Sequence, residues 1–328
     1  MNNNMILMLA VIASLCMCGC QKENNDLAES KPLTTEEIEK FRFPAPFDWQ
    51  AHRGGRGLYP ENTIPAFLGM SKFPVRTLEL DVVISKEAVP VVSHEPWMSA
   101  EICLDTMGEK MENAQGEALR ILDMPYSEIR QYDCGSRRPA SFPRQQTSTV
   151  QKPTLQAVLR SVTSYYPAQG KAIPAFNIEI KSRPEWDGTL TPPPSEFVSN
   201  VLGVIRGFTG NQRLDICIQS FDERALEAVK KQSPEMQTAL LVENNQSVQD
   251  NLSRLTFQPD IYSPRFDLLS AEDVEYLHSQ EIEVIPWTVN QLPDMVRVIN
   301  MGVDGLITDY PDIIPELRNL GQPNPAAR

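Results

Sequence analysis

Histidine, cysteine and positive charge are all scarce in this chain of 328 residues. It has three histidines and six cysteines, and its formal net charge is −13, with a pI near 4.8. An acidic balance of this size argues against nucleic acid as a partner and against attraction to an anionic lipid surface by charge. An anionic small molecule would therefore have to be attracted by local positive charge within a site.

Long hydrophobic runs are also missing, apart from one short run near the N-terminus. Residues 5–17 are almost wholly apolar, too short to span a membrane comfortably but typical of a secretory signal, so we expect a signal peptide over residues 1–19. Gly19 before Cys20 resembles a bacterial lipoprotein processing site. It predicts acylation of Cys20 and an extracytoplasmic, membrane-anchored lipoprotein, periplasmic or on the outer surface. An ordinary secretory signal and a secreted periplasmic protein are the alternative.

The segment after Cys20 is polar and charged. Residues 20–43 show no strand pattern and at most one short helix, and they predict a flexible tether to the lipid bilayer. Residues 44–328 then form the globular part. Protein partners cannot be read from the sequence.

Three cysteines lie beyond Cys20. Cys103 and Cys134 fall in one segment, while Cys217 falls in an expected core strand. In an oxidising compartment a disulfide between Cys103 and Cys134 is the best pairing, with two free thiols as the alternative. None of the three has the spacing of a metal site.

Short apolar runs alternate eight times with helical patterns, which is the signature of a parallel sheet built from strand–helix units. The expected strands cover residues 49–52, 77–82, 176–181, 215–219, 238–242, 261–263, 283–287 and 305–308. The expected helices cover residues 64–71, 155–165, 195–206, 223–231, 246–255, 271–280, 293–300 and 313–320. Eight repeats favour a (β/α)₈ TIM barrel, an α/β fold, over a doubly wound open sheet, for which no Gly-rich dinucleotide fingerprint is present.

One element interrupts this alternation. Residues 77–85 run almost directly into residues 89–94, and so short a connection requires an antiparallel hairpin. If the turn centres on Lys86 and Glu87, Glu79 lies opposite His94 on the same face, whereas a slip of one residue turns His94 away. Residues 96–150 follow without a strong period, and we expect them to form a small insertion at the barrel mouth.

Charged pairs with a spacing of two residues mark the ends of two expected strands. Glu79 and Asp81 project from the same face of their strand, as Glu179 and Lys181 do from theirs. Neighbouring carboxylates repel one another unless a cation lies between them, and their oxygen atoms suit Mg²⁺ or Ca²⁺ better than Zn²⁺. Solvated or salt-bridged acids are the alternative for either pair taken alone.

The order of these motifs resembles the glycerophosphodiester phosphodiesterase family. The motifs run from His52-Arg53-Gly54 and Glu61-Asn62 through Glu79-x-Asp81, His94 and Glu179-x-Lys181 to Gln219-Ser220-Phe221, Trp287-Thr288-Val289-Asn290 and the segment from Gly305 to Pro311. The resemblance covers about residues 47–318. It departs from the family pattern after the second histidine, where Glu95 replaces the usual Asp, and in the hairpin turn, where Glu87-Ala88 replaces Asp-Gly.

The resemblance implies a role for each motif residue. His52 and His94 would be the general acid–base pair, since imidazole titrates near neutral pH. Glu79, Asp81 and Glu179 would hold one divalent cation. The expected extracytoplasmic location slightly favours Ca²⁺ over Mg²⁺, because calcium is plentiful there. Arg53 and Lys181 would bind the phosphate, Trp287 would form a wall of the pocket, and Glu61 and Asn62 would support the site.

The implied activity is hydrolysis of a small-molecule glycerophosphodiester to glycerol 3-phosphate and an alcohol. A phospholipase C-type or lysophospholipase D-type phosphodiesterase on the same barrel is the nearest alternative. A lipoprotein that binds phosphodiesters or glycans without turnover is the alternative from another class. Head-group preference depends on the insertion and the rim loops, and the sequence leaves it open.

Overall fold

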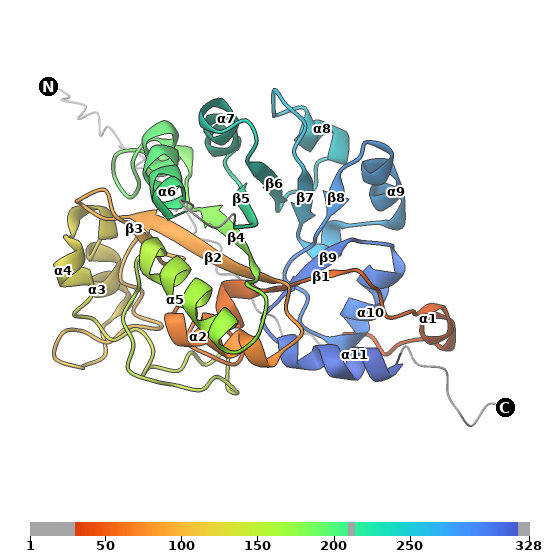
Figure 1. Ribbon diagram of the computed structural model, residues 1–328, viewed down its shortest axis with the longest axis horizontal. Coiled ribbons are helices and arrows are strands. Elements are labelled where there is room, and N and C mark those ends of the chain that lie inside the picture. Colours follow the sequence, from red (N-terminus) through yellow and green to blue (C-terminus); the bar gives the residue numbers. More distant parts are fainter. Residues whose placement is uncertain (1–29, 209–213, 321–328) are drawn as a thin grey trace, which may run out of the picture.

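The computed structural model describes residues 30–208 and 214–320 (Figure 1). The expected signal peptide and Cys20 lie outside these residues. None of the helices in the described ranges is long and apolar enough to cross a membrane.

Eight parallel strands curl into a barrel, in the order β8-β7-β6-β5-β4-β2-β1-β9 (Figure 1). They are β1 (Asp48–Ala51), β2 (Thr77–Ile84), β4 (Ala175–Ile180), β5 (Ile216–Ser220), β6 (Gln237–Val242), β7 (Ile261–Pro264), β8 (Glu283–Val284) and β9 (Gly305–Thr308). Backbone hydrogen bonds from Ile307 N to Pro286 O (2.9 Å) and from Val289 N to Ile307 O (2.9 Å) join β9 to the segment after β8, so that the barrel is nearly closed. The (β/α)₈ prediction is confirmed.

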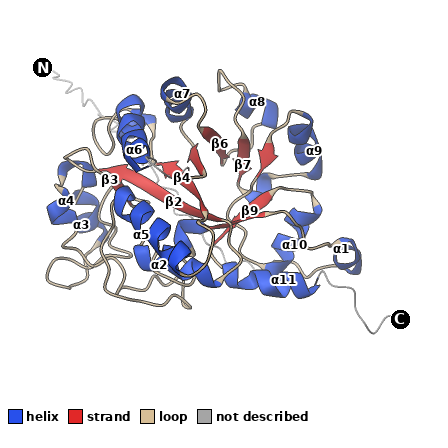
Figure 2. Ribbon diagram, viewed as in Figure 1, coloured by secondary structure: helices blue, strands red, loops and turns tan. Residues whose placement is uncertain are grey.

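Helices surround this sheet, one after each barrel strand (Figure 2). They are α2 (Ile64–Gly69), α5 (Leu155–Ala168), α6 (Pro194–Phe208), α7 (Glu223–Gln232), α8 (Val248–Leu252), α9 (Ala271–Ser279), α10 (Leu292–Asn300) and α11 (Ile314–Leu320). Successive side chains of β2 point alternately toward the surrounding helices and toward the barrel interior. Leu78, Leu80 and Val82 are fully buried against the helices, whereas Glu79 and Asp81 point to the barrel interior.

The barrel interior has an apolar part and a polar layer. The apolar part comprises Cys217, Ala239, Ile261, Ile285 and Ile307. In the polar layer the Asn177 amide donates to Gln50 (2.8 Å) and Gln219 (2.9 Å), and Gln219 in turn donates to Glu79 (2.9 Å). Every strand here is buried on both faces, so these polar groups need hydrogen-bond partners inside the barrel. They satisfy this need by hydrogen bonding to one another.

The expected strand at residues 283–287 is wrong in length, because β8 covers only Glu283–Val284. Pro286 has no N–H to donate to a ladder, so regular pairing stops before it. The chain continues along β7 nevertheless, since Trp287 N donates to Pro264 O (3.0 Å). The helix expected over residues 246–255 is likewise shorter, at Val248–Leu252.

The hairpin prediction holds, but its register is wrong by one residue. Strand β3 (Pro90–Val92) pairs antiparallel with β2, and Val82 lies opposite Val92. The turn therefore centres on Glu87, and Ala88 adopts a positive φ of 60° there. His94 still reaches the acids, because the ladder ends after Ser93 N donates to Asp81 O (3.0 Å) and the chain then leaves the sheet in a bend.

The insertion forms a small cap with its own core. It carries α3 (Asn113–Ala118) and α4 (Tyr126–Ile129), and Cys103 and Cys134 form a disulfide between its two halves. Its buried side chains pack on Val83 and Val91, where β2 and β3 extend beyond the barrel. The hairpin thus gives the insertion a rigid base next to the barrel mouth.

Much of the segment expected to be a flexible tether is packed on the barrel. Helix α1 (Thr35–Lys40) lies along α10 (Figure 1), and Arg297 of α10 donates to the Glu37 carboxylate (2.8 Å). Phe41, directly after α1, is only 1% exposed. The expectation of a linker up to residue 43 is therefore wrong from residue 30 onward, because aromatic side chains in a polar segment gave too weak a pattern to be recognised. We call residues 30–43 the N-terminal strap.

Candidate active site

Three buried carboxylates meet at the C-terminal ends of β2 and β4. Glu79, Asp81 and Glu179 each offer an oxygen within 4.8 Å of the others. Asp81 and Glu179 lie side by side because β2 and β4 pair in register. Parallel strands deliver such residues to one mouth of a barrel.

The loop after β1 holds this cluster from one side. Arg53 N donates to Glu79 (2.7 Å), and the Asn62 side chain donates to Asp81 (2.8 Å) while accepting from Asp81 N (3.2 Å). The tight loop requires a left-handed backbone at Gly54 and Gly55, with φ of 77° and 79°, which glycine adopts at little cost. Thr63, not Asn62, caps α2, so Asn62 is left to fix the position of Asp81.

His52 lies at the end of β1, 8% exposed, and its Nδ1 is 2.7 Å from the Asp309 carboxylate. Asp309 is itself held by Arg56 (2.9 Å) and the Asn290 amide (2.7 Å). Burial lowers the pKa of His52, although the negative charge of Asp309 opposes this. The pairing leaves Nε2 of His52 for contact with a ligand.

His94 has a similar arrangement, with Nδ1 2.7 Å from the Glu95 carboxylate. His94 interacts electrostatically with both Asp81 and Glu179, so its ring lies beside the acid cluster. The Lys152 ammonium donates to Ser93 Oγ (2.8 Å), and this hydroxyl donates to Glu95 O (2.7 Å). These contacts fix the bend that carries His94.

Two basic residues complete the cluster. Lys181 Nζ lies 2.8 Å from Glu179 and 3.8 Å from Asp81, and these acids outweigh the effect of burial and raise the pKa of Lys181. The Arg53 guanidinium lies 3.2 Å from Glu61 and 3.5 Å from Asp81. Positive charge therefore stands next to the acids within a strongly acidic protein.

Trp287 borders the site above the barrel interior. It packs edge-on against Phe221, with ring centroids 5.4 Å apart, and its indole N–H donates to Ser263 O (2.9 Å). The ring remains partly exposed. An apolar face is thus available to the carbon atoms of a ligand.

The acid cluster fits a divalent cation. Burial, and next the charge of Asp81, raise the pKa of Glu79 well above its usual value. Burial also raises the pKa of Glu179, although Lys181 opposes it. Asp81 Oδ1 is buried and accepts no hydrogen bond from the described residues. Three oxygen donors, one of them without a donor partner, are what a hard cation needs.

The structure brings together the candidate residues that the sequence indicates, but several of their partners were not predicted. The structure gathers His52, Arg53, Glu61, Asn62, Glu79, Asp81, His94, Glu179, Lys181 and Trp287 at this mouth. Asp309 and Gln219 lie within quoted motifs, yet no role was given to them. Arg56 and Lys152 carried no signal, because an isolated basic residue in a loop matches no motif.

Comparison with known proteins identifies this arrangement. The family model for the glycerophosphoryl diester phosphodiesterase family matches residues 52–313. The chain belongs to this family. It is therefore an enzyme, a hydrolase of the phosphodiesterase family, and its motif residues occupy the mouth of the family barrel.

Individual relatives of the family agree. A glycerophosphodiester phosphodiesterase from Caldanaerobacter subterraneus subsp. tengcongensis is 29% identical over 271 residues, 83% of this chain and 97% of that protein. The crystal structure of a protein from Silicibacter pomeroyi DSS-3 that is described as a glycerophosphoryl diester phosphodiesterase superposes with a TM-score of 0.75 at 28% identity. The match covers 87% of this chain and 98% of that one. An Oleispira antarctica phosphodiesterase, solved with its product sn-glycerol-3-phosphate, shares the fold with a TM-score of 0.65 at 21% identity, covering 83% of this chain and 96% of that one.

Proposed function

We propose that this protein hydrolyses glycerophosphodiesters to glycerol 3-phosphate and an alcohol, with His52 and His94 as the acid–base pair and a divalent cation on the acid cluster. The observation that carries the proposal is one buried cluster of oxygen donors flanked by two imidazoles, each paired with a carboxylate. The relatives named above carry the matching activity in their names.

The two histidines suit opposite proton transfers. Burial lowers the pKa of His52, which favours the neutral imidazole that a general base requires. His94 is the other imidazole of the site, and it is oriented by the Glu95 carboxylate and lies beside the acid cluster. We therefore assign the base to His52 and the acid, which protonates the leaving alcohol, to His94.

The negative charge of a bound substrate's phosphate would be balanced by the cation and by the neighbouring basic side chains. Glu79, Asp81 and Glu179 would hold the cation, and an all-oxygen set suits Ca²⁺ or Mg²⁺. When bound, the cation supplies positive charge to the phosphate oxygens. Arg53 and Lys181 add further positive charge beside it, and Trp287 offers a surface for the glycerol carbons. We favour Ca²⁺ slightly, because an extracytoplasmic site would meet it in quantity.

A substrate panel tests this assignment. Wild type and His52→Ala are assayed with glycerophosphocholine and a lysophospholipid, with chelator, Mg²⁺ or Ca²⁺, and the products are identified. We expect release of glycerol 3-phosphate, loss of activity with chelator, and a roughly 1,000-fold decrease in His52→Ala. His278→Ala is the matched control, since His278 lies on α9, is 41% exposed in its side chain and pairs with Asp304 outside the site.

Each other product points to a different enzyme. Lysophosphatidate from the lysophospholipid would indicate a lysophospholipase D, and a cyclic phosphate would indicate a phospholipase C-type reaction. Activity that chelator does not reduce would contradict the role of the cation. Binding without turnover of any diester would favour the non-catalytic lipoprotein.

We also propose that the protein is anchored outside the cytoplasm by an acyl chain on Cys20. Ser30 N donates to the Gln291 side chain (3.0 Å), next to Asn290, which binds Asp309. Nine residues, 21–29, separate Cys20 from this point, a reach of roughly 30 Å when extended. An anchor there would hold the catalytic mouth near the bilayer. Expression of the full chain tests this: Cys20→Ser should move the protein from the membrane to the soluble fraction, and an unchanged distribution would contradict the anchor.

A further inference from the structure

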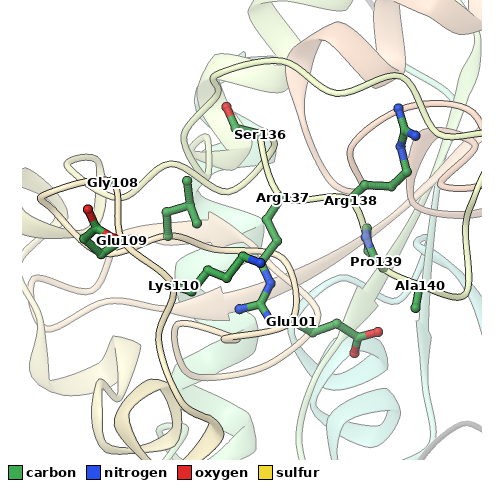
Figure 3. A pocket seen from close by; sticks show the side chains of 10 residues that line it. Glu101, Gly108, Glu109, Lys110, Ser136, Arg137, Arg138, Pro139 and Ala140 are labelled. Carbon is green, nitrogen blue, oxygen red and sulfur yellow. The ribbon is translucent and has the colours of Figure 1, made fainter.

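A pocket in the insertion lies beside the catalytic mouth and has no role in the chemistry proposed above. Its volume is about 830 Å³, within the range of small-molecule sites. Two stretches line it, Glu101 to Lys110 on one side and Ser136 to Ala140 on the other (Figure 3).

The two walls are held firmly together. The disulfide between Cys103 and Cys134 joins them, and Leu104 N donates to Asp133 O (2.7 Å). The Asp133 carboxylate also accepts from the backbone N–H groups of Gly135 (3.0 Å) and Ser136 (3.1 Å). The side chains that follow on this wall therefore project from a fixed backbone.

Charged side chains of both signs line the pocket, with Lys110, Arg137 and Arg138 as the bases and Glu101 and Glu109 as the acids. In Figure 3 the Arg137 side chain extends between Lys110 and Glu101, while Arg138 points away from them. Arg137 donates to the backbone carbonyl of Ala100. Among the described residues, neither Arg137 nor Lys110 lies within ion-pair distance of a carboxylate, unlike Arg53 and Arg56 at the catalytic mouth. Two neighbouring cations repel one another unless an anion lies between them.

Both walls lead directly into the catalytic site. Glu101 follows Glu95 by six residues, and its carboxyl group interacts electrostatically with Glu61 and Glu95. On the other wall, Phe142 packs under the Arg56 guanidinium, 4.8 Å from the ring centroid, and Arg56 holds Asp309. A substrate whose phosphodiester lies at the acid cluster can therefore extend its alcohol portion toward the pocket.

We propose that this pocket binds a second anionic group on the alcohol portion of the substrate through Arg137 and Lys110. The preferred substrates are then glycerophosphodiesters whose alcohol carries a further phosphate. The inference rests on the proposed function and adds a substrate class to it. Arg137 provides the planar fork that suits a phosphate, and Lys110 provides a compact charge beside it.

Paired substrates test the pocket. The kcat/KM of wild type, Lys110→Gln and Arg137→Gln is measured for bis(glycerophospho)glycerol, which has a second phosphate, and for glycerophosphocholine, which has none. We expect wild type to prefer the former, and each variant to lose about 10- to 100-fold on it while changing less than about twofold on glycerophosphocholine. The exposed Arg160→Gln on α5 removes one charge far from the pocket and should change neither value.

The other outcomes are distinct. If Arg137→Gln does not fold, Lys110→Gln alone decides, because its exposed side chain makes no described hydrogen bond. Equal losses on both substrates, or a gain on glycerophosphocholine, would overturn the pocket assignment and leave the proposed function intact. If no diester is hydrolysed, the proposed function fails. Calorimetry with glycerol 1,3-bisphosphate then decides whether the pocket binds anions. If no binding is measured, the pocket assignment is overturned together with the proposed function.

Discussion

Glu95 follows His94 directly in the chain, and its side chain turns back to the Nδ1 atom of this neighbour (2.7 Å). His52 reaches a carboxylate differently, through Asp309, which is 257 residues away in the chain (2.7 Å). Each ring is thus oriented through its Nδ1 atom by a carboxylate. A carboxylate in this position orients the imidazole and stabilises its protonated form.

The Glu95 carboxylate should make stability depend on pH in acid. Burial tends to raise its pKa, but His94 outweighs burial and lowers the pKa to about 2 from an ordinary 4.5. A pKa that is lower in the folded state stabilises the fold above about pH 4.5, and this contribution is lost as the pH falls toward 2. We therefore expect the destabilisation caused by Glu95→Gln to shrink between about pH 5 and pH 3 in urea unfolding. Glu316→Gln, an exposed change on α11, is the control, and a pH-independent Glu95→Gln effect would contradict the pairing.

The site residues that sequence analysis found are those fixed by local geometry. Glu79 and Asp81 were predictable because a strand places alternate residues on one face and parallel strands end at one mouth. The pairing of Asp309 with His52 was not predictable from the sequence, because a contact between the first and last barrel strands depends on closure of the sheet. Lys152 acts through Ser93 on the bend at His94, and nothing in its sequence neighbours indicates that contact.

At the scale of elements, the hairpin and the insertion form one unit. The hairpin was predictable from its short connection, but its register was not, because a turn with Glu87 at its centre has no glycine or asparagine to fix the turn type. The insertion was predictable only as a segment without the strand–helix pattern of the barrel. Its small helices and shared core on Val83 and Val91 depend on contacts that no sequence period reveals.

The disulfide should control the stability of this unit. Cys103 and Cys134 are separated by 31 residues, and a loop of that length predicts a loss of about 3–4 kcal/mol in the free energy of unfolding when the bond is removed. We expect a reductant to lower the urea midpoint of the wild type but not that of Cys103→Ala/Cys134→Ala. A wild-type midpoint that does not respond to reductant would show that the thiols are free.

At the scale of the whole molecule, the N-terminal strap joins residues from the first part of the chain to the last barrel units. Arg297 contacts Glu37 (2.8 Å), and the Asn300 amide donates to Glu37 O (3.0 Å). Phe43 stacks on Trp49 at the start of β1, with ring centroids 5.7 Å apart. Eightfold alternation made the barrel predictable, whereas the strap follows no repeat and becomes visible only through its packing on α10.

Two neighbouring hydrophobic residues of the strap allow a direct test of this packing. Phe41 is 1% exposed, whereas Ile38, one turn earlier on α1, is 39% exposed. Truncating a buried phenylalanine removes its packing and leaves a cavity, so Phe41→Ala should lower the free energy of unfolding by about 3–5 kcal/mol. Ile38→Ala should change it by less than about 0.5 kcal/mol, as surface substitutions usually do. Urea unfolding of a chain beginning at Ser30 gives both values, and equal effects of the two substitutions would mean that the strap does not unfold together with the barrel.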